Sequence, residues 1–111
     1  EITAEGEWSL LYFNGAFSHA LVKKAKAGDF RVQHVHGGTM HPAEAPAWMR
    51  RSGENILAQL PDTMLYARVD GVVSRDAFVL MELELIEPVL YLAQGEQAPE
   101  QWAAAIQTRC C

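Results

Sequence analysis

The feature that most constrains this fold is that every second residue over 65–73 and 77–85 is apolar or glycine. Successive side chains of a strand point to opposite faces, so residues of one parity share a face. The odd positions of both segments are all apolar or glycine: Leu65, Ala67, Val69, Gly71 and Val73, then Ala77, Val79, Met81, Leu83 and Leu85. The two segments therefore predict a β-hairpin whose odd face packs against the core.

The even positions of this predicted hairpin carry charge. Arg68 and Asp70 lie on the first strand, and Glu82 and Glu84 lie on the second. A three-residue connection, 75–77, keeps the two apolar sets on one face. It places Asp70 opposite Glu82, with their Cβ atoms about 4.5–5.5 Å apart. Arg68 then lies opposite Glu84, and the Asp70–Glu82 pair is destabilising unless its like charges are relieved.

Two kinds of relief are available to such a pair, a raised carboxyl pKa or a bound cation. Carboxylate oxygens suit a hard cation, and Mg²⁺ typically takes one or two carboxylates together with substrate phosphates. A neighbouring arginine such as Arg68 pairs well with phosphate. The alternative is a solvated sheet face with alternating charges, in which Arg68 and Glu84 form a surface ion pair. The unrelieved Asp70–Glu82 pair favours the metal site.

A second hairpin is predicted near the start of the chain. The extended runs 7–13 and 17–23 are joined around Asn14-Gly15, a dipeptide that readily supplies the positive φ angles of a tight type I′ turn. The following stretch, 25–42, is rich in glycine, histidine and charge, and it predicts a long loop of the kind that often carries function, either throughout or with a short strand at 30–35.

Two helices complete the predicted order. Pro46 suits the first turn of a helix that ends at Pro61, and 99–109 predicts a terminal helix with Trp102 and Ile106 inward. The tryptophans are expected in the core: Trp8, Trp48 and Trp102. The order ββ–loop–α–ββ–α indicates an α+β fold with an antiparallel sheet and helices packed on one face.

Composition narrows the class of protein. A chain of 111 residues, half of them hydrophobic, predicts a single domain over residues 1–111. The net charge of −5 argues against a nucleic-acid binder, which needs a clustered basic face. No apolar run reaches membrane-spanning length, and from this sequence we expect no signal peptide. The adjacent Cys110 and Cys111 make no disulfide framework, so we expect a reduced, cytoplasmic protein without a membrane partner.

A basic cluster stands out from the acidic background. Lys23, Lys24 and Lys26 lie together, with Arg31 shortly after. Lysines at a strand end are typical of a solvated edge. The alternative interpretation is a local anion site.

The histidines give a different hypothesis. His34 and His36 share one side of an extended segment, and His41 could close a three-ligand Zn²⁺ site. Nothing in the spacing matches a known zinc signature, so exposed histidines are the competing interpretation. His19 falls in the first hairpin and is expected to be packed or on the surface.

Several motifs together resemble a known family. Residues 66–70 (Tyr-Ala-Arg-Val-Asp) followed by 80–88 (Leu-Met-Glu-Leu-Glu-Leu-Ile-Glu-Pro) resemble the carboxy-terminal part of an ATP-grasp domain, where an Arg-x-Asp strand precedes a Glu-x-Asn or Glu-x-Glu strand. Residues 24–38 resemble the loop that follows the central hairpin in glutathione synthetases and in ligases that glutamylate proteins or cofactors. Residues 6–9 (Gly-Glu-Trp-Ser) resemble the start of that hairpin. The resemblance runs through nearly the whole chain in the right order.

This resemblance implies an ATP-dependent ligase that joins a carboxylate to an amine or a thiol. A small carboxylate substrate attacks the γ-phosphate of ATP, and the nucleophile then displaces phosphate from the acyl phosphate. Such chemistry depends on positioning and charge neutralisation and needs no covalent enzyme intermediate.

The resemblance also implies roles for particular residues. It implies one or two Mg²⁺ ions held by three carboxylates: Asp70, Glu82 and Glu84. Arg68 would act as a catalytic contact to the transferred phosphoryl oxygens. Arg31 would neutralise the γ-phosphate or the substrate carboxylate, acting in both catalysis and ATP binding. Glu7 would bind the ribose hydroxyls, and Lys24 is expected among the nucleotide-binding residues.

Two departures from the family pattern bear on function. The last position of the metal strand is commonly Asn and is Glu84 here, which adds negative charge and favours a second cation. The chain also begins where the family's adenine-binding hinge should lie, so we expect the amino-terminal and phosphate-loop subdomains to be absent. The alternative function is therefore a non-catalytic remnant that forms a homo-oligomer or binds a second polypeptide.

Overall fold

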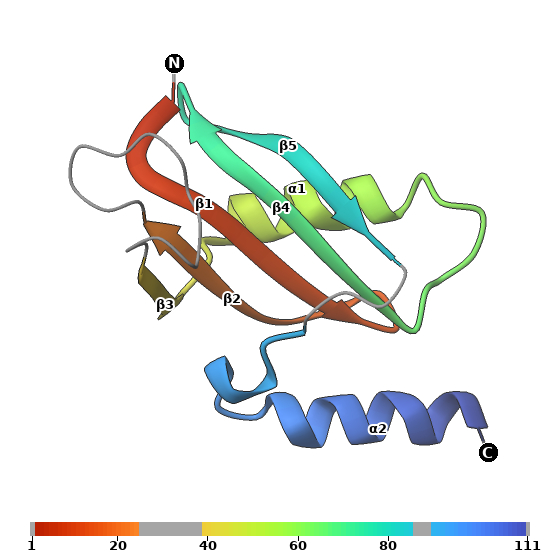
Figure 1. The fold of residues 1–111 in the computed structure, drawn as a ribbon. Coiled ribbons are helices and arrows are strands. Elements are labelled where there is room, and N and C mark those ends of the chain that lie inside the picture. The colour runs from red at the N-terminus through yellow and green to blue at the C-terminus, as the bar shows by residue number, and fades with distance from the viewer. Residues whose placement is uncertain (1, 25–38, 86–89, 111) are drawn as a thin grey trace.

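A computed structural model describes residues 2–24, 39–85 and 90–110, which form one antiparallel sheet flanked by helices (Figure 1). The sheet has five strands in the order β3-β2-β1-β4-β5. The strands are β1 (Ile2–Phe13), β2 (Ala16–Lys24), β3 (Thr39–Ala43), β4 (Tyr66–Ser74) and β5 (Ala77–Glu84). The helices are α1 (Ala47–Leu57), a short 3₁₀ helix η1 (Leu92–Gln94) and α2 (Ala98–Cys110). This confirms the predicted α+β class. Neither α1 nor α2 has the length and apolar character that crossing a membrane requires.

The first predicted hairpin is confirmed. Phe13 pairs with Ala16, and the two residues between them, Asn14 and Gly15, have φ angles of 52° and 81°. Positive φ at both central positions is what a type I′ turn needs, and Asn-Gly adopts it at little cost. The turn sets the pairing of Tyr12 with Phe17, and a one-residue shift of register then places Leu11 opposite His19.

The predicted loop over 25–42 was wrong at its end. Residues 39–43 form β3, an edge strand that pairs antiparallel with β2 and places Pro42 opposite Leu21. Proline is tolerated at an edge because its missing N–H can lie on the unpaired side. The glycine-rich stretch 25–38 lies outside the described residues.

One face of the sheet packs against α1 and holds the main core. Its buried members are Trp8, Leu10, Tyr12, Ala20, Val22, Ala45, Met49, Ala67, Val69 and Val73. Met49 and Gly53 are the buried residues of α1, and they lie one helical turn apart. Trp48 is 37% exposed, which corrects its predicted core position. It lies about 100° around the helix axis from Met49 and so misses the narrow stripe that faces the sheet.

The second helix packs on side chains of the opposite face. The ring centroid of Trp102 lies 5.1 Å from that of Phe13 and 5.6 Å from that of Tyr66, which face away from α1. In Figure 1, α1 runs behind the sheet and α2 lies below it. The two helices thus cover different faces, whereas the sequence pattern assigned them to one. Ala98 and Ala105 are the buried residues of the described part of α2, and Ile106 is 36% exposed, so the inward position predicted for Ile106 was wrong.

The connection between β4 and β5 also differs from the prediction. Ser74 pairs with Ala77, so the turn contains the two residues 75–76, both with positive φ, and not three. The register then shifts by one residue between Asp70 and Gly71, which marks a β-bulge. The turn is one residue shorter than predicted and β5 contains one extra residue, so their effects on the register cancel. The pairing beyond the bulge is therefore the one the sequence predicted.

The bulge changes which residues of β5 face the core. Met81 is the extra residue, and between it and the turn the two faces are interchanged relative to the prediction. Phe78 packs against the core, while Val79 is 43% exposed and Met81 is 60% exposed. The predicted inward positions of Ala77, Val79 and Met81 were therefore wrong. Leu83, beyond the bulge, keeps its predicted contact with the core.

Candidate functional site

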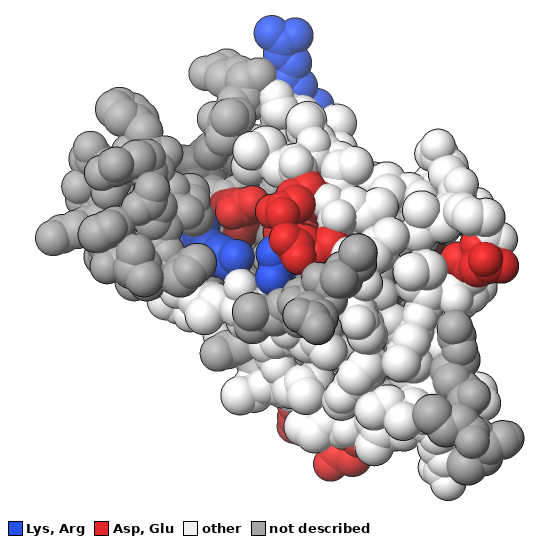
Figure 2. Space-filling model, turned by 45° about the vertical axis from the view of Figure 1, so that its right-hand side comes forward, with Lys and Arg blue, Asp and Glu red and all other residues white. Residues whose placement is uncertain are grey.

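A group of polar side chains lies on the sheet face that points away from α1. We call it the charged face, and its members are Glu7, Ser9, Lys23, Arg68, Asp70, Glu82 and Glu84. Ser9 lies opposite Asp70 across β1 and β4, and Asp70 lies opposite Glu82 across β4 and β5. Figure 2 shows acidic and basic side chains gathered beside one another on this side of the molecule. Four neighbouring strands, β2, β1, β4 and β5, thus bring together residues that are far apart in the sequence.

A buried ion pair between Arg68 and Asp70 lies at the centre of the charged face. Arg68 Nη2 donates to Asp70 Oδ2 at 2.9 Å, and Arg68 Nε lies 3.1 and 3.2 Å from the two carboxylate oxygens. The side chains are only 9% and 2% exposed. Burial disfavours the charged guanidinium, but the hydrogen bonds and charge of Asp70 outweigh this cost, and the pKa of Arg68 is raised. The carboxylate therefore holds the guanidinium charged and in a fixed orientation.

The predicted crowding of carboxylates is present on β5. Register places Asp70 opposite Glu82 and Arg68 opposite Glu84, as predicted. A hydrogen bond with Glu84 is the largest cause of a raised pKa at Glu82, followed by some loss of hydration and by the negative charges of Glu84 and Asp70. A raised carboxyl pKa is one of the two forms of relief that the sequence indicated. A positive charge placed beside Glu82 and Glu84 would therefore stabilise their ionised forms.

Glu7 and Lys23 extend the charged face along β1 and β2, where they lie opposite each other. Burial raises the pKa of Glu7, and the charge of Asp70 adds to the increase, while Lys23 and Arg68 oppose it. Lys23 is buried, so its interpretation as part of a solvated edge was wrong. Lys24, the predicted ligand, is exposed, because adjacent residues of a strand point to opposite faces.

Ser9 is a member of the charged face that the sequence analysis missed. The residue is fully buried, and within the described ranges its Oγ is the one buried side-chain oxygen or nitrogen atom without a hydrogen-bond partner. The sequence did contain one indication of this position: Ser9 lies two residues after Glu7 on β1, so the two side chains share a face. A buried hydroxyl left unsatisfied beside Asp70 is costly in a purely structural role.

Tyr91 and His19 were also not assigned to the site from the sequence. Lys23 Nζ lies 5.2 Å and Arg68 Cζ 5.7 Å from the centroid of the Tyr91 ring. His19 is buried and its Nε2 lies 2.9 Å from Leu90 O and 3.0 Å from Tyr91 O. The prediction that His19 is packed or on the surface is thus resolved as packed. No local pattern around residue 91 indicates that its ring meets β2 and β4.

The buried imidazole predicts a specific loss of stability in acid. Burial lowers the pKa of His19 below 6.5 and outweighs the carbonyls of Leu90 and Tyr91, which raise it. The folded protein therefore resists protonation, and stability is complete above pH 6.5 and falls as pH drops toward the folded pKa. The loss is about 1.4 kcal/mol for each unit between the two pKa values.

Chemical unfolding of the wild type and His19→Gln from pH 8 to pH 4.5 measures this effect. Glu7 acts in the opposite direction, because its raised pKa adds stability as pH falls toward 4.5. That contribution is common to both proteins and cancels in their difference. A difference curve that stays flat below pH 6.5 would contradict the assignment to His19.

The remaining predicted site residues are Arg31 and the three histidines of the zinc hypothesis. Arg31, His34 and His36 lie outside the described residues, and His41 is exposed on β3. The zinc hypothesis therefore stays untested. Within residues 2–24, 39–85 and 90–110, no three histidine, cysteine or acidic side chains gather closely enough to hold a metal by themselves.

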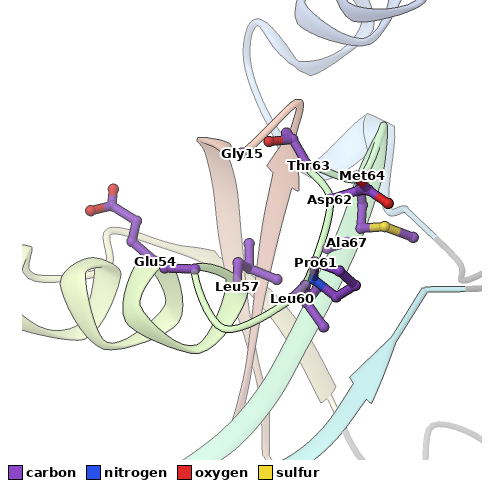
Figure 3. A pocket seen from close by; sticks show the side chains of 10 residues that line it. Gly15, Glu54, Leu57, Leu60, Pro61, Asp62, Thr63, Met64 and Ala67 are labelled. Carbon is purple, nitrogen blue, oxygen red and sulfur yellow. The ribbon is translucent and has the colours of Figure 1, made fainter.

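A separate hollow of about 270 Å³ lies at the far end of α1. Figure 3 shows it between the last turn of α1, the loop that follows and the β1–β2 turn at Gly15. Its lining includes two acidic residues, Glu54 and Asp62, but no basic residue and no member of the charged face. It is not part of the candidate site, and its two exposed acids serve below as control positions.

Solved structures relate this arrangement to known enzymes. The crystal structure of the D-cycloserine synthetase DcsG matches 95% of this chain with a TM-score of 0.78 and 28% identity. The chain has the fold of the ATP-grasp ligases. A D-alanine–D-alanine ligase from Bacillus anthracis complexed with ATP shares the fold at a TM-score of 0.66 and 17% identity, and a second structure of that ligase does so at 0.60 and 21%. Each of these matches covers 96% of this chain.

The match covers most of this chain but only part of each solved ligase. This chain spans just over a third of each solved chain, at 38%, 37% and 36%. No protein-family model matches the sequence, and no curated protein matches it either. The predicted family resemblance and the predicted ATP-grasp lobe are confirmed by the structural matches.

The side chains of the ATP-grasp fold seen here fit a magnesium ion by their donor chemistry. Glu82 and Glu84 are close enough to share a proton, and Glu82 is exposed. Two such carboxylates cannot form a complete protein cage, but Mg²⁺ ordinarily takes one or two carboxylates and completes its shell with water and phosphate oxygens. Both oxygens of Asp70 accept hydrogen bonds from Arg68. Metal binding by Asp70 would therefore compete with that ion pair.

Proposed function

We propose that this chain is part of an ATP-dependent carboxylate–amine or carboxylate–thiol ligase and supplies the end of the site that holds the ATP phosphates. The observation that carries the proposal is the charged face itself. A buried, oriented arginine lies directly beside a pair of carboxylates with a strained charge balance, on an ATP-grasp sheet. We also propose, from the sequence resemblance, that this chain corresponds to the carboxy-terminal part of an ATP-grasp domain.

The proposed reaction has two balanced steps. An oxygen of the substrate carboxylate attacks the γ-phosphorus of ATP, the bond to the bridging oxygen breaks and ADP leaves. The amine or thiol then attacks the acyl carbon, inorganic phosphate leaves and the nucleophile loses its proton. Negative charge gathers on the phosphoryl oxygens in the first step.

Arg68 is the residue best placed to meet that charge. Its guanidinium is held by Asp70 before the reaction begins, so no reorganisation is needed when charge develops. Lys23 adds a second buried cation, which lies over the Tyr91 ring near Arg68. In this proposal Lys23 has the nucleotide-binding role that the sequence analysis gave to Lys24. Glu7 is proposed to bind the ribose hydroxyls, and Arg31 keeps its predicted role toward the γ-phosphate.

Glu82 and Glu84 would hold Mg²⁺, with Asp70 as the further predicted ligand. When bound, the ion supplies positive charge between the phosphates and these carboxylates. The raised pKa of Glu82 supports this assignment, because its hydrogen bond with Glu84 and the negative charges of Glu84 and Asp70 disfavour its ionised form.

Calorimetric titration of Mg-ATP and a non-hydrolysable analogue tests the proposal. We expect magnesium-dependent binding that Glu82→Gln/Glu84→Gln weakens roughly 10–100-fold, because a contact to a charged group contributes about 1.5–3 kcal/mol. The matched control is Glu54→Gln/Asp62→Asn, which removes two exposed acids away from the charged face. Equal affinity in the wild type and the charged-face variant would contradict the metal assignment. Absence of nucleotide binding by the wild type would contradict the proposed function.

A second candidate function is association with another chain. Three consecutive apolar side chains on the edge strand β5 are exposed: Val79, Leu80 and Met81. An edge strand with exposed apolar residues is a surface for pairing with a second copy or another polypeptide. Sedimentation of the titration samples separates the candidates, since a stable dimer without nucleotide affinity favours this one.

A further inference from the structure

Tyr91 combines an unusual backbone with an unusual environment. Its φ and ψ are 54° and 46°, a left-handed conformation that a bulky residue rarely adopts. Its half-buried ring lies against both cations of the charged face, at 5.2 Å from Lys23 Nζ and 5.7 Å from Arg68 Cζ. A strained residue that persists at a site must be held there by its surroundings.

His19 holds this segment in place. Leu90 O and Tyr91 O are carbonyl acceptors, so His19 Nε2 carries a hydrogen and donates to them at 2.9 and 3.0 Å. The other ring nitrogen, Nδ1, lies 2.8 Å from Ser18 Oγ, which itself contacts Gln101 of α2. The strained turn is therefore tied to β2 and, through Ser18, to α2.

The Tyr91 ring offsets the repulsion between the two cations of the charged face. Lys23 and Arg68 both lie within about 6 Å of one ring centroid, the range in which the negative face of an aromatic ring attracts a cation. Two neighbouring positive charges repel each other. Asp70 holds the Arg68 guanidinium through hydrogen bonds from Nε and Nη2. The face of the Tyr91 ring provides a second contact to the same guanidinium. The two cations can then stay close together and both remain on the charged face.

We propose that Tyr91 is a positioning residue that orients Arg68 and Lys23 for a polyanionic ligand, and that His19 is the anchor that sets the Tyr91 ring. The ligand named here, the phosphate chain of a nucleotide, rests on the proposed function. The orientation of Arg68 by the ring does not rest on it and is measured separately.

The first measurement follows the Nε–Hε signal of Arg68 by NMR, assigned with Arg68→Lys. A ring face beside the guanidinium shifts this signal through its ring current. Tyr91→Phe keeps the ring, so the signal should stay close to the wild-type position. Tyr91→Leu removes the ring and should move the signal. His19→Phe removes the donor without touching Arg68, and it should move the signal in the same direction as Tyr91→Leu.

The second measurement is Mg-ATP affinity for the same variants. We expect about tenfold weaker binding for Tyr91→Leu and near wild-type binding for Tyr91→Phe, a split consistent with loss of a desolvated cation–π contact. A merely structural role would lower the melting temperature of Tyr91→Leu and leave its Mg-ATP affinity at the wild-type value. That result would overturn the proposal.

The two readouts also separate this inference from the proposed function. If the wild type binds no nucleotide, the proposed function fails, while a moved Arg68 signal in both Tyr91→Leu and His19→Phe still supports the positioning of Arg68. If nucleotide binds and the Arg68 signal is the same in all variants, the positioning role fails and the proposed function stands.

Discussion

Replacing Asp70 with alanine is expected to lower the free energy of unfolding by about 3–5 kcal/mol. The substitution leaves the Arg68 guanidinium, only 9% exposed, without the carboxylate that accepts three of its hydrogen-bonding contacts. An uncompensated buried charge costs far more than the net contribution of the intact pair. Denaturant unfolding at neutral pH measures the change.

A double substitution distinguishes a structural from a functional reason for this pair. Arg68→Met/Asp70→Leu replaces both charges with apolar side chains, and it is expected to recover most of the stability lost in Asp70→Ala. It should not recover Mg-ATP binding, because the oriented cation is gone. Recovery of both would show that the pair serves only the fold. Stability in Asp70→Ala equal to that of the wild type would show that the pair is not buried in solution.

Replacing Gly71 with alanine is expected to destabilise the protein by about 3 kcal/mol, at the upper end of the usual cost of overpacking. A Cβ at Gly71 would lie 2.5 Å from Phe78 Cζ and closer still to the carbonyl oxygen of Val79. The ring can move, but the backbone of β5 cannot move without losing its pairing with β4. Glycine within a strand often marks such a close approach beside a bulge.

A double-mutant cycle with Phe78→Leu tests this explanation. Phe78→Leu should relieve the contact of the new methyl group with the ring and leave the contact with the Val79 carbonyl. The double variant is therefore expected to recover only part of the loss, measured against Phe78→Leu alone. Full recovery would contradict a backbone origin. Because the bulge sets the pairing of Asp70 with Glu82, Gly71→Ala should also weaken any magnesium-dependent nucleotide binding.

The bulge shows how a sequence pattern can lead to the right register through the wrong connection. Parity alone predicted Asp70 opposite Glu82 with a three-residue turn, and the pairing is correct. The protein reaches it with a two-residue turn and one extra residue, Met81, in β5. Parity counts only whether the number of intervening residues is odd or even. It does not say where along the hairpin an extra residue is placed.

Local patterns determined much of this protein from the sequence alone. The type I′ turn at Asn14-Gly15, the α+β class, and the shared face of Arg68 with Asp70 and of Glu82 with Glu84 all depend on φ preferences and on the two-residue period of a strand. These are properties of neighbouring residues. They are expressed in any fold that contains the same strands.

Only the tertiary structure decided how the charged face is completed. Whether Lys23 lies in solvent or is buried, and where the ring of Tyr91 lies, depend on which strands become neighbours and on where the chain returns after β5. His19 anchors that return from 72 residues away in the sequence. Contacts of this kind arise from packing and burial between distant segments, and no local period records them.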